Sequence, residues 1–341
     1  MNHETEEESI TGVKTKVPRI GFLGVGKTGK QRMDAIRESK YAAVVSLCDP
    51  YEGNTVQFCK DNNLKNVYSY EALLQEDIDG IVIATPNVLH KHHAIRALEN
   101  GKSVFCQSPL ACTEADAREV IEVAKQNDCL LMTDFSYRHT RSLQKIKTLI
   151  DANELGQMFA IQLSCHHAQH EQQVLDSEFS GGGCLTDLGV HLIDILYWLF
   201  PAMEVRIINS EKFIHGTSLE NPLVQVEDYV MSQIRFSNGL VAQVCCSWNS
   251  HIGKESIIEF NFQGTKGGAT FRNVNGSLYD FKGEYYKGSK RQVLSLPPDE
   301  WHGKSAVQWA SRLAEKNEYH HHIEAYLKTA STLDRIYFEG R

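Results

Sequence analysis

The sequence predicts an α/β protein in two parts: a parallel sheet covered by helices, then an α+β domain with a large, open, mostly antiparallel sheet. From Val17 onward, short β-branched runs alternate with longer segments of helical period, which is typical of a parallel sheet. After Arg138 this rhythm gives way to long segments of alternating polarity. The 341 residues also exceed what one hydrophobic core usually organises, so two domains of about 150 residues each are expected.

The first domain is expected to consist of short strands that alternate with helices. The expected strands are residues 19–23, 42–47, 66–68, 80–84, 103–106 and 129–133. The expected helices are residues 30–39, 55–61, 70–75, 90–99 and 114–126. Asn100-Gly101 favours a helix end, because glycine accepts the left-handed conformation, and Thr113 favours the start of the next helix.

The second domain is expected to contain long strands that pair antiparallel. The expected strands are residues 157–164, 226–236, 240–248 and 256–263. Asn238-Gly239 is a hairpin signal between two of them, and Gly264 with Gly267-Gly268 marks another reversal. Helices are expected at residues 142–153 and 185–200 and over most of 306–338. The predicted organisation is a disordered leader (1–16), a first domain (17–138) and a second domain (139–341).

Composition excludes several classes of function. The formal charge of −8, from 43 acidic and 35 basic residues, gives no overall attraction to nucleic acid or to an anionic membrane. No apolar run approaches the ~20 residues that a membrane span needs, and residues 1–16 lack the apolar core of a secretory signal. The nine cysteines are odd in number and have no CxxC spacing, which argues against a disulfide framework. A cytoplasmic protein is therefore expected.

A glycine-rich turn follows the first predicted strand. Its residues are Gly24, Val25, Gly26, Lys27, Thr28 and Gly29, a GxGxxG pattern where strand gives way to helix. The first glycine permits a tight turn, the second lets a pyrophosphate approach the backbone, and the third permits close packing of helix on sheet. This placement predicts a Rossmann dinucleotide site, with an ordinary glycine-rich turn as the alternative.

Asp49 ends the second predicted strand, about 25 residues after the first glycine, where a carboxylate can accept both hydroxyls of the adenosine ribose. A 2′-phosphate about 4 Å from this carboxylate would be repelled by a few kcal/mol at a surface-like dielectric. No Arg or Lys lies between residues 49 and 59 to compensate. We therefore expect NAD rather than NADP, with a solvated turn carboxylate as the alternative interpretation of Asp49.

Polar side chains also follow the fourth predicted strand. Thr85, Pro86, Asn87 and His90 are expected at the carboxyl edge of the sheet, where open α/β sheets bind their ligands. We assign all four to the cofactor site. A simple helix cap is the alternative for Asn87.

The predicted helix 185–200 carries Asp187, His191 and Asp194 at helical spacing, which places them on one face. A histidine flanked by carboxylates is suited to take a hydroxyl proton while hydride leaves the same carbon, and Asp187 would orient the ring. The alternative is a core histidine satisfied by a neighbouring carboxylate.

Several segments in order carry a resemblance to a known family: RIGFLGVGKTG, CDP, ATPNVLH, HHAIRALENGKSVF, GGGCLTDLGVHLIDILYWLF and FQGTKGG. From about Val17 to Phe338 the chain resembles the glucose-fructose oxidoreductase, inositol dehydrogenase and rhizopine-catabolism (Gfo/Idh/MocA) family. The resemblance implies hydride exchange between a nicotinamide and a sugar or cyclic polyol. It also implies a homodimer or homotetramer built through the second sheet, and it assigns the acid/base pair to His191 and Asp187.

One position departs from the family pattern. Members usually carry Glu-Lys-Pro after the fifth strand, whereas this chain has Gln107-Ser108-Pro109. A serine hydroxyl hydrogen-bonds but does not supply the charge of an ammonium. We assign Gln107 to the cofactor site and Ser108 to both the cofactor site and catalysis. Without the lysine, two outcomes are equally compatible with the sequence: retained proton transfer through His191, or reduced or redirected activity.

The resemblance also places Tyr137 and Arg138 beside substrate, with a structural salt bridge as the alternative for Arg138. His166, His167 and His170 follow the first strand of the second domain, and His166 is assigned to the sugar pocket. No ligand spacing for a metal is complete, so no metal is expected. The run 320–322 cannot present three ligands from one helix face and is interpreted as surface.

The leading hypothesis is an NAD-dependent oxidoreductase for a secondary alcohol or ketone of a sugar, sugar derivative or cyclitol. Two alternatives stay open. A regulatory sensor would bind NAD without turnover, and an NAD-dependent glycosidase would cleave a glycoside with no net change in NADH. Consumption of cofactor distinguishes these classes from the dehydrogenase.

Overall fold

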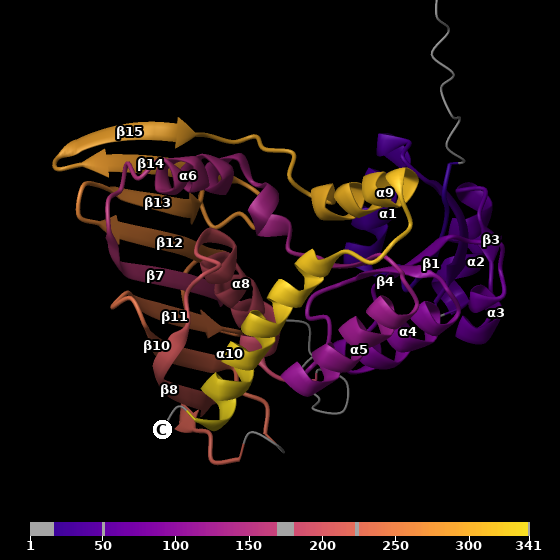
Figure 1. Cartoon of the computed structure of the whole chain (residues 1–341), viewed down its shortest axis with the longest axis horizontal. Coiled ribbons are helices and arrows are strands. Elements are labelled where there is room, and N and C mark those ends of the chain that lie inside the picture. The colour runs from indigo at the N-terminus through magenta and orange to yellow at the C-terminus, as the bar shows by residue number, and fades with distance from the viewer. Residues whose placement is uncertain (1–16, 50–51, 169–180, 222–224, 340–341) are drawn as a thin grey trace, which may run out of the picture.

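A computed structural model describes residues 17–49, 52–168, 181–221 and 225–339. Two sheets and their covering helices make up this part of the chain (Figure 1). The predicted leader 1–16 and His170 lie outside the described residues. None of the described helices is both long and apolar enough to cross a membrane.

The first sheet has six strands in the order β3-β2-β1-β4-β5-β6, and every pair is parallel. Its strands are β1 (Arg19–Leu23), β2 (Ala43–Cys48), β3 (Lys65–Asn66), β4 (Gly80–Ile83), β5 (Ser103–Cys106) and β6 (Leu131–Thr133). Its helices are α1 (Lys27–Ser39), α2 (Glu52–Asp61), α3 (Tyr70–Leu74), α4 (Asn87–Glu99) and α5 (Glu114–Gln126). This order confirms the predicted parallel sheet. Helices α1 and α4 begin three residues earlier than expected, directly after the turns that carry Gly26 and Pro86.

The second sheet has nine strands in the order β15-β14-β13-β12-β7-β11-β10-β8-β9. Its strands are β7 (Met158–His167), β8 (Val205–Ile214), β9 (Thr217–Ser218), β10 (Tyr229–Phe236), β11 (Val241–Ser247), β12 (Ser256–Gly264), β13 (Gly268–Asn273), β14 (Phe281–Lys287) and β15 (Lys290–Ser295). The pairing is mostly antiparallel, as predicted. The pair β7 and β11 is parallel, which corrects the expectation for these two strands. Between them the described chain runs through helical residues and the strands β8, β9 and β10, so no hairpin fixes their direction.

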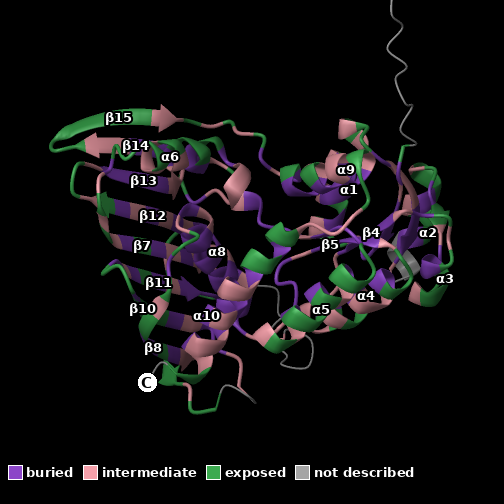
Figure 2. Cartoon of the chain, viewed as in Figure 1, coloured by how far each residue is buried: buried purple, intermediate pink, exposed green. Residues whose placement is uncertain are grey.

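Helices cover one face of the second sheet: α6 (Arg141–Asp151), α8 (Val190–Leu199) and α10 (Tyr326–Phe338) (Figure 1). On β10, Val230 and Ile234 are buried under these helices, whereas Met231 and Arg235 are exposed. Because side chains alternate between the faces of a strand, the other face of the sheet is open. Figure 2 shows the buried residues gathered where α8 and α10 meet the strands.

The C-terminal segment contributes to both parts of the molecule. The predicted helical region 306–338 contains α9 (Lys304–Glu315), a 3₁₀ helix (His321–Ala325) and α10. Helix α9 packs on α1 and β5, and its fully buried Trp309 joins the core of the first sheet. The Trp309 ring lies 5.9 Å from Phe105, and a Cβ at Gly80 would lie 2.9 Å from it. The C-terminal region therefore does not pack solely within the second domain.

We expect Trp309→Ala to lower the free energy of unfolding by about 3–5 kcal/mol. The substitution leaves a cavity between α9 and the first sheet, and the paired strands of the sheet cannot move to fill it. Chemical denaturation measures the change. Tyr68→Ala, at a site with 72% exposure, is the matched control and should cost little. Equal losses in the two variants would contradict the role of Trp309.

Candidate active site

The glycine loop occupies the expected turn between β1 and α1. Gly24 has a φ of +89°, and a Cβ there would lie 2.5 Å from the carbonyl oxygen of Ala84. A Cβ at Gly29 would lie 2.6 Å from the carbonyl oxygen of Gly24. At Gly26 a Cβ would meet no atom within 4 Å. The outer glycines are thus required by packing, and the middle one faces open space at a helix N-terminus, as a bound pyrophosphate requires.

Asp49 follows β2 and lies against this loop. Its Oδ2 accepts a hydrogen bond from the backbone N–H of Val25 at 2.8 Å. The Nζ of Lys27, in the same loop, lies 5.9 Å from the ring centroid of Tyr279. The carboxylate and the phosphate-binding turn predicted from the sequence therefore lie together.

The turn after β4 differs from expectation at His90. This imidazole is fully buried, with Nδ1 2.7 Å from the carbonyl oxygen of Pro109 and Nε2 2.7 Å from that of Thr85. Both ring nitrogens are therefore occupied, so His90 ties two loops together rather than facing a cofactor. Thr85 and Asn87 are half-buried at the sheet edge, and Asn87 begins α4 without acting as its cap.

The two halves of the molecule meet at Ser108 and His191. Ser108, two residues after β5, places its Oγ 3.1 Å from Nε2 of His191, which lies in the first turn of α8. Ser108 is buried and follows Gln107. The residue that replaces the expected lysine therefore contacts the histidine assigned to proton transfer.

Aromatic rings enclose His191. The rings of Phe135 and Tyr137 meet it edge-on, with centroids at 5.8 and 5.6 Å. Its Nδ1 is buried and has no hydrogen-bond partner among the described residues. Burial lowers the pKa of His191, opposed first by the charge of Asp134 and then by those of Asp187 and Asp194. At neutral pH the ring is therefore uncharged and able to accept a proton.

The predicted orienting bond from Asp187 is not formed. The Oδ2 of Asp187 accepts a hydrogen bond from Nε1 of Trp248 at 3.1 Å, and Nδ1 of His191 stays without a partner among the described residues. The physical reason is local geometry: residues Leu185–Gly189 form a π-helical turn, so a spacing of four no longer aligns two side chains as it does in an α-helix. Asp187 acts on His191 through its charge rather than through a hydrogen bond.

Arg138 makes the salt bridge that was the alternative to substrate binding. Its Nε donates to Oδ2 of Asp194 at 2.7 Å, and its Nη2 donates to Oδ1. Asp194 is almost completely buried, so this pairing holds α8 against the start of the second domain. The ring of the neighbouring Tyr137 stacks on Trp301 at 5.7 Å.

The structure corrects the placement of His166. Ile161, Leu163 and Cys165 point to the helix-covered face of β7, so His166 points to the open face, away from His191. There its Nδ1 lies 2.7 Å from Oγ of Ser247. His167 is on the covered face, with Nε2 3.8 Å from Sγ of Cys165. The alternation of apolar and polar residues in this strand was the available signal, but the predicted strand ended at residue 164, before either histidine.

A buried ion pair next to His191 was not predicted. The Nε of Arg32, on α1, donates to Oδ2 of Asp134 at 2.5 Å, and Oγ of Ser136 donates to Oδ1 at 2.5 Å. Asp134 follows β6, so it stands at the same sheet edge as Asp49. That position at the end of a strand was the available signal. Within the described residues, no group of three or more His, Cys, Asp or Glu is arranged to hold a metal.

Comparison with known proteins identifies the family of both domains. Residues 18–135 match the family described as an oxidoreductase family with an NAD-binding Rossmann fold, and residues 143–270 match the GFO/IDH/MocA C-terminal domain. Glucose-6-phosphate 3-dehydrogenase of Bacillus subtilis is 26% identical over 67% of this chain and 67% of its own length. The scyllo-inositol 2-dehydrogenase (NAD⁺) of the same organism is 26% identical over 79% and 78%.

Solved structures share the fold. A levoglucosan dehydrogenase in complex with NADH and L-sorbose superposes with a TM-score of 0.78 at 21% identity, covering 95% of this chain and 97% of that one. A 3-ketoreductase from Actinomadura kijaniata with NADP and TDP-benzene gives 0.80 at 18% identity, covering 94% and 97%. The two matched regions together span most of the chain and follow each other in the family's order. The chain therefore belongs to the GFO/IDH/MocA family of NAD(P)-binding sugar and cyclitol oxidoreductases.

Proposed function

We propose that the protein is an NAD-dependent oxidoreductase that exchanges hydride with a secondary alcohol or ketone of a sugar, sugar derivative or cyclitol. The observation that carries this proposal is the contact of Ser108 with His191 at the carboxyl edge of the first sheet. This contact places His191, a group able to accept or donate a proton, at the sheet edge where the glycine loop would bind the dinucleotide. The sugar and inositol dehydrogenases among the relatives support the substrate class.

His191 carries the proton in this proposal. The Ser108 O–H donates to the uncharged Nε2, and the Ser108 oxygen accepts from the reacting hydroxyl. As the serine proton moves to Nε2, the proton of the reacting hydroxyl replaces it on Ser108. The bound nicotinamide supplies the hydride acceptor. Phe135 and Tyr137 keep water from the ring, and the charge of Asp187 stabilises the imidazolium that forms. A hydroxyl in place of an ammonium provides no charge for an alkoxide, so His191 carries more of the catalysis.

The cofactor site in this proposal consists of the glycine loop and the strand ends around it. Its members are Gly24, Val25, Gly26, Lys27, Thr28, Gly29, Asp49, Thr85, Pro86, Asn87, Gln107 and Ser108. Tyr137, Asp187, His191 and His167 border the substrate, with His167 in place of His166. His90 and Arg138 act as positioning residues.

Asp49 selects NAD over NADP in this proposal. We expect Asp49→Asn to raise the affinity for NADPH relative to NADH by at least ~10-fold, because the amide keeps an acceptor for Val25 and removes the repulsion of a 2′-phosphate. Fluorescence titration with both cofactors measures the ratio. Asp61→Asn makes the same change of charge at an exposed position on α2 and should leave the ratio unchanged. Tighter binding of NADPH than NADH by the unaltered protein would contradict the assignment.

The test of function is NADH absorbance over time. NAD is supplied with aldoses, inositols and sugar phosphates, and NADH is supplied with keto-sugars. Signal with one substrate supports the dehydrogenase. The change to Ser108 favours the regulatory sensor as a second candidate, since a sensor binds NAD without needing the lysine. NADH binding without turnover of any substrate or glycoside would support that candidate.

The open face of the second sheet supports a homodimer or homotetramer as part of the proposal. Ile207 and Met231 are exposed on neighbouring strands of this face. Burying such apolar side chains against a second copy is favourable. Light scattering of the purified chain measures its molar mass in solution, and a monomer at micromolar concentration would contradict the proposed oligomer.

We also propose a cytoplasmic location, because the cysteine pattern favours a reducing compartment.

A further inference from the structure

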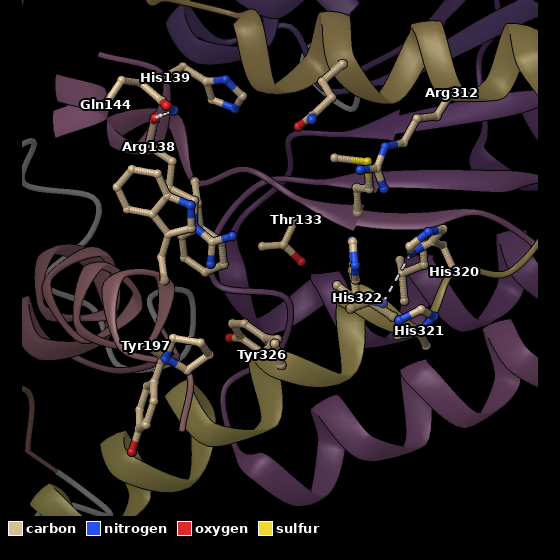
Figure 3. A pocket seen from close by; sticks show the side chains of 18 residues that line it. Thr133, Arg138, His139, Gln144, Tyr197, Arg312, His320, His321, His322 and Tyr326 are labelled. Atoms are coloured by element: carbon tan, nitrogen blue, oxygen red, sulfur yellow. Dashed lines mark hydrogen bonds between the residues drawn. The ribbon is translucent and has the colours of Figure 1, made fainter. Parts of the chain in front are cut away.

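A pocket lies beside β6, an edge strand of the first sheet. Its volume is about 570 Å³, which is in the range of small-molecule sites. The pocket lies between β6, α9, the end of α8 and the 3₁₀ helix His321–Ala325 (Figure 3). None of the glycine-loop residues and neither Ser108 nor His191 lines it. The pocket shares Phe135 and Arg138 with the surroundings of His191, but it contains none of the residues proposed to react.

The charge of this pocket is of one sign. Arginine and histidine side chains line it, and no Asp or Glu does so among the residues that the structure describes. Arg138 is already paired with Asp194. Arg312, on α9, makes no ion pair within the described ranges. Its guanidinium is thus a cation beside a pocket that has no carboxylate of its own.

Three imidazoles add hydrogen-bonding groups to the lining of the pocket beside Arg312. The sequence placed His320, His321 and His322 on the surface, and the structure gathers them, with ring centroids 4.9, 4.2 and 4.8 Å apart. The Nδ1 of His320 accepts a hydrogen bond from the backbone N–H of His322 at 3.3 Å, so the Nε2 of His320 carries the hydrogen. Figure 3 shows the three rings on the same side of the view as Arg312. The three rings therefore provide further donors rather than a metal centre.

Thr133 supplies an independent sign of a ligand. This residue ends β6, is only 6% exposed and lines the pocket. Its Oγ1 is buried and has no hydrogen-bond partner within the described part of the chain. A buried hydroxyl without a partner costs free energy, and an oxyanion in the pocket would remove that cost.

We propose that this pocket binds a small phosphate-bearing molecule. The fork of Arg312 and the N–H of His320 hold the phosphate oxygens, and the Thr133 hydroxyl donates to a further oxygen. Three different donors around one group match the several acceptor oxygens of a phosphate better than the two of a carboxylate. The rings of Tyr197, Trp198 and Tyr326 also line the pocket and face the organic part of the ligand.

The test is calorimetric titration of the full chain with phenyl phosphate and inorganic phosphate, in parallel with benzoate. Phenyl phosphate should bind, and Arg312→Gln should weaken it at least ~10-fold. Arg206→Gln removes an exposed arginine elsewhere and should have no effect. Thr133→Val should weaken binding without lowering the melting temperature, because the hydroxyl has no partner among the described residues of the protein alone.

Four outcomes would overturn the proposal. Equal losses in Arg312→Gln and Arg206→Gln would show non-specific attraction of anions. Binding that survives Arg312→Gln and disappears when NADH is added would belong to the glycine loop. Benzoate that binds as tightly as phenyl phosphate would show a carboxylate site, and absence of binding by both phosphate probes would show no anion site.

Discussion

His191→Ala is expected to lower turnover at least ~100-fold while NADH still binds, in line with the usual contribution of general acid/base catalysis. The variant removes the nitrogen that lies 3.1 Å from Oγ of Ser108 and leaves the glycine loop untouched. Single-turnover kinetics with the best substrate of the panel, together with an NADH titration, separate the loss of chemistry from a loss of binding.

His92→Ala is the matched control, since His92 is exposed on α4 and should keep full activity. An unchanged rate in His191→Ala would contradict the assignment of the proton to this residue. A loss of NADH binding equal to the loss of turnover would show a structural role instead.

The pH profile provides a second readout for the same residue. Burial lowers the pKa of His191 below its usual value near 6.5, so the uncharged base is present at neutral pH. Activity in the direction of alcohol oxidation should therefore hold as the pH falls through 6.5 and should decline only in more acidic solution, once the ring becomes charged. A decline centred above 6.5 would contradict the environment described for His191.

The first sheet could be predicted well because each of its signals is local. A parallel strand buried on both faces is a short apolar run. Gly24 is fixed by its positive φ within the turn, and Gly29 by the carbonyl oxygen of Gly24, five residues earlier. The same local rule located Asp49, whose position at the end of a strand is sufficient to bring it to the loop. Such features need no knowledge of distant contacts.

The errors have three origins: the end of a strand, the geometry of one helical turn and a tertiary contact. One residue of difference in a strand moves a side chain to the other face, and β7 continues through His167, three residues beyond the predicted strand end, so the faces of His166 and His167 were not assigned. Likewise Asp187 lost its alignment with His191 through a π-helical turn. The partner of Arg138 was decided by tertiary contact with Asp194, 56 residues away.

The sequence showed that Asp134 follows a strand, but the ion pair with Arg32 depends on a contact between distant segments. Removal of this pair gives the second large expected effect, a loss of stability. Asp134→Ala should lower the free energy of unfolding by about 3–5 kcal/mol. The Arg32 side chain is only 8% exposed, so removal of its carboxylate leaves a charge that water cannot easily reach. Chemical denaturation measures the loss, and the double variant Arg32→Met with Asp134→Leu should recover most of it.

The matched variant Asp134→Asn separates charge from shape. Its amide oxygen can still accept a hydrogen bond from Arg32, so the stability loss should be smaller than in Asp134→Ala. The charge of Asp134 is the largest one that raises the pKa of His191, and the charge of Arg32 lowers it. Asp134→Asn should therefore shift the acid limb of the activity profile to lower pH. A stability loss without any shift of that limb would mean that the pair supports the fold alone and does not tune His191.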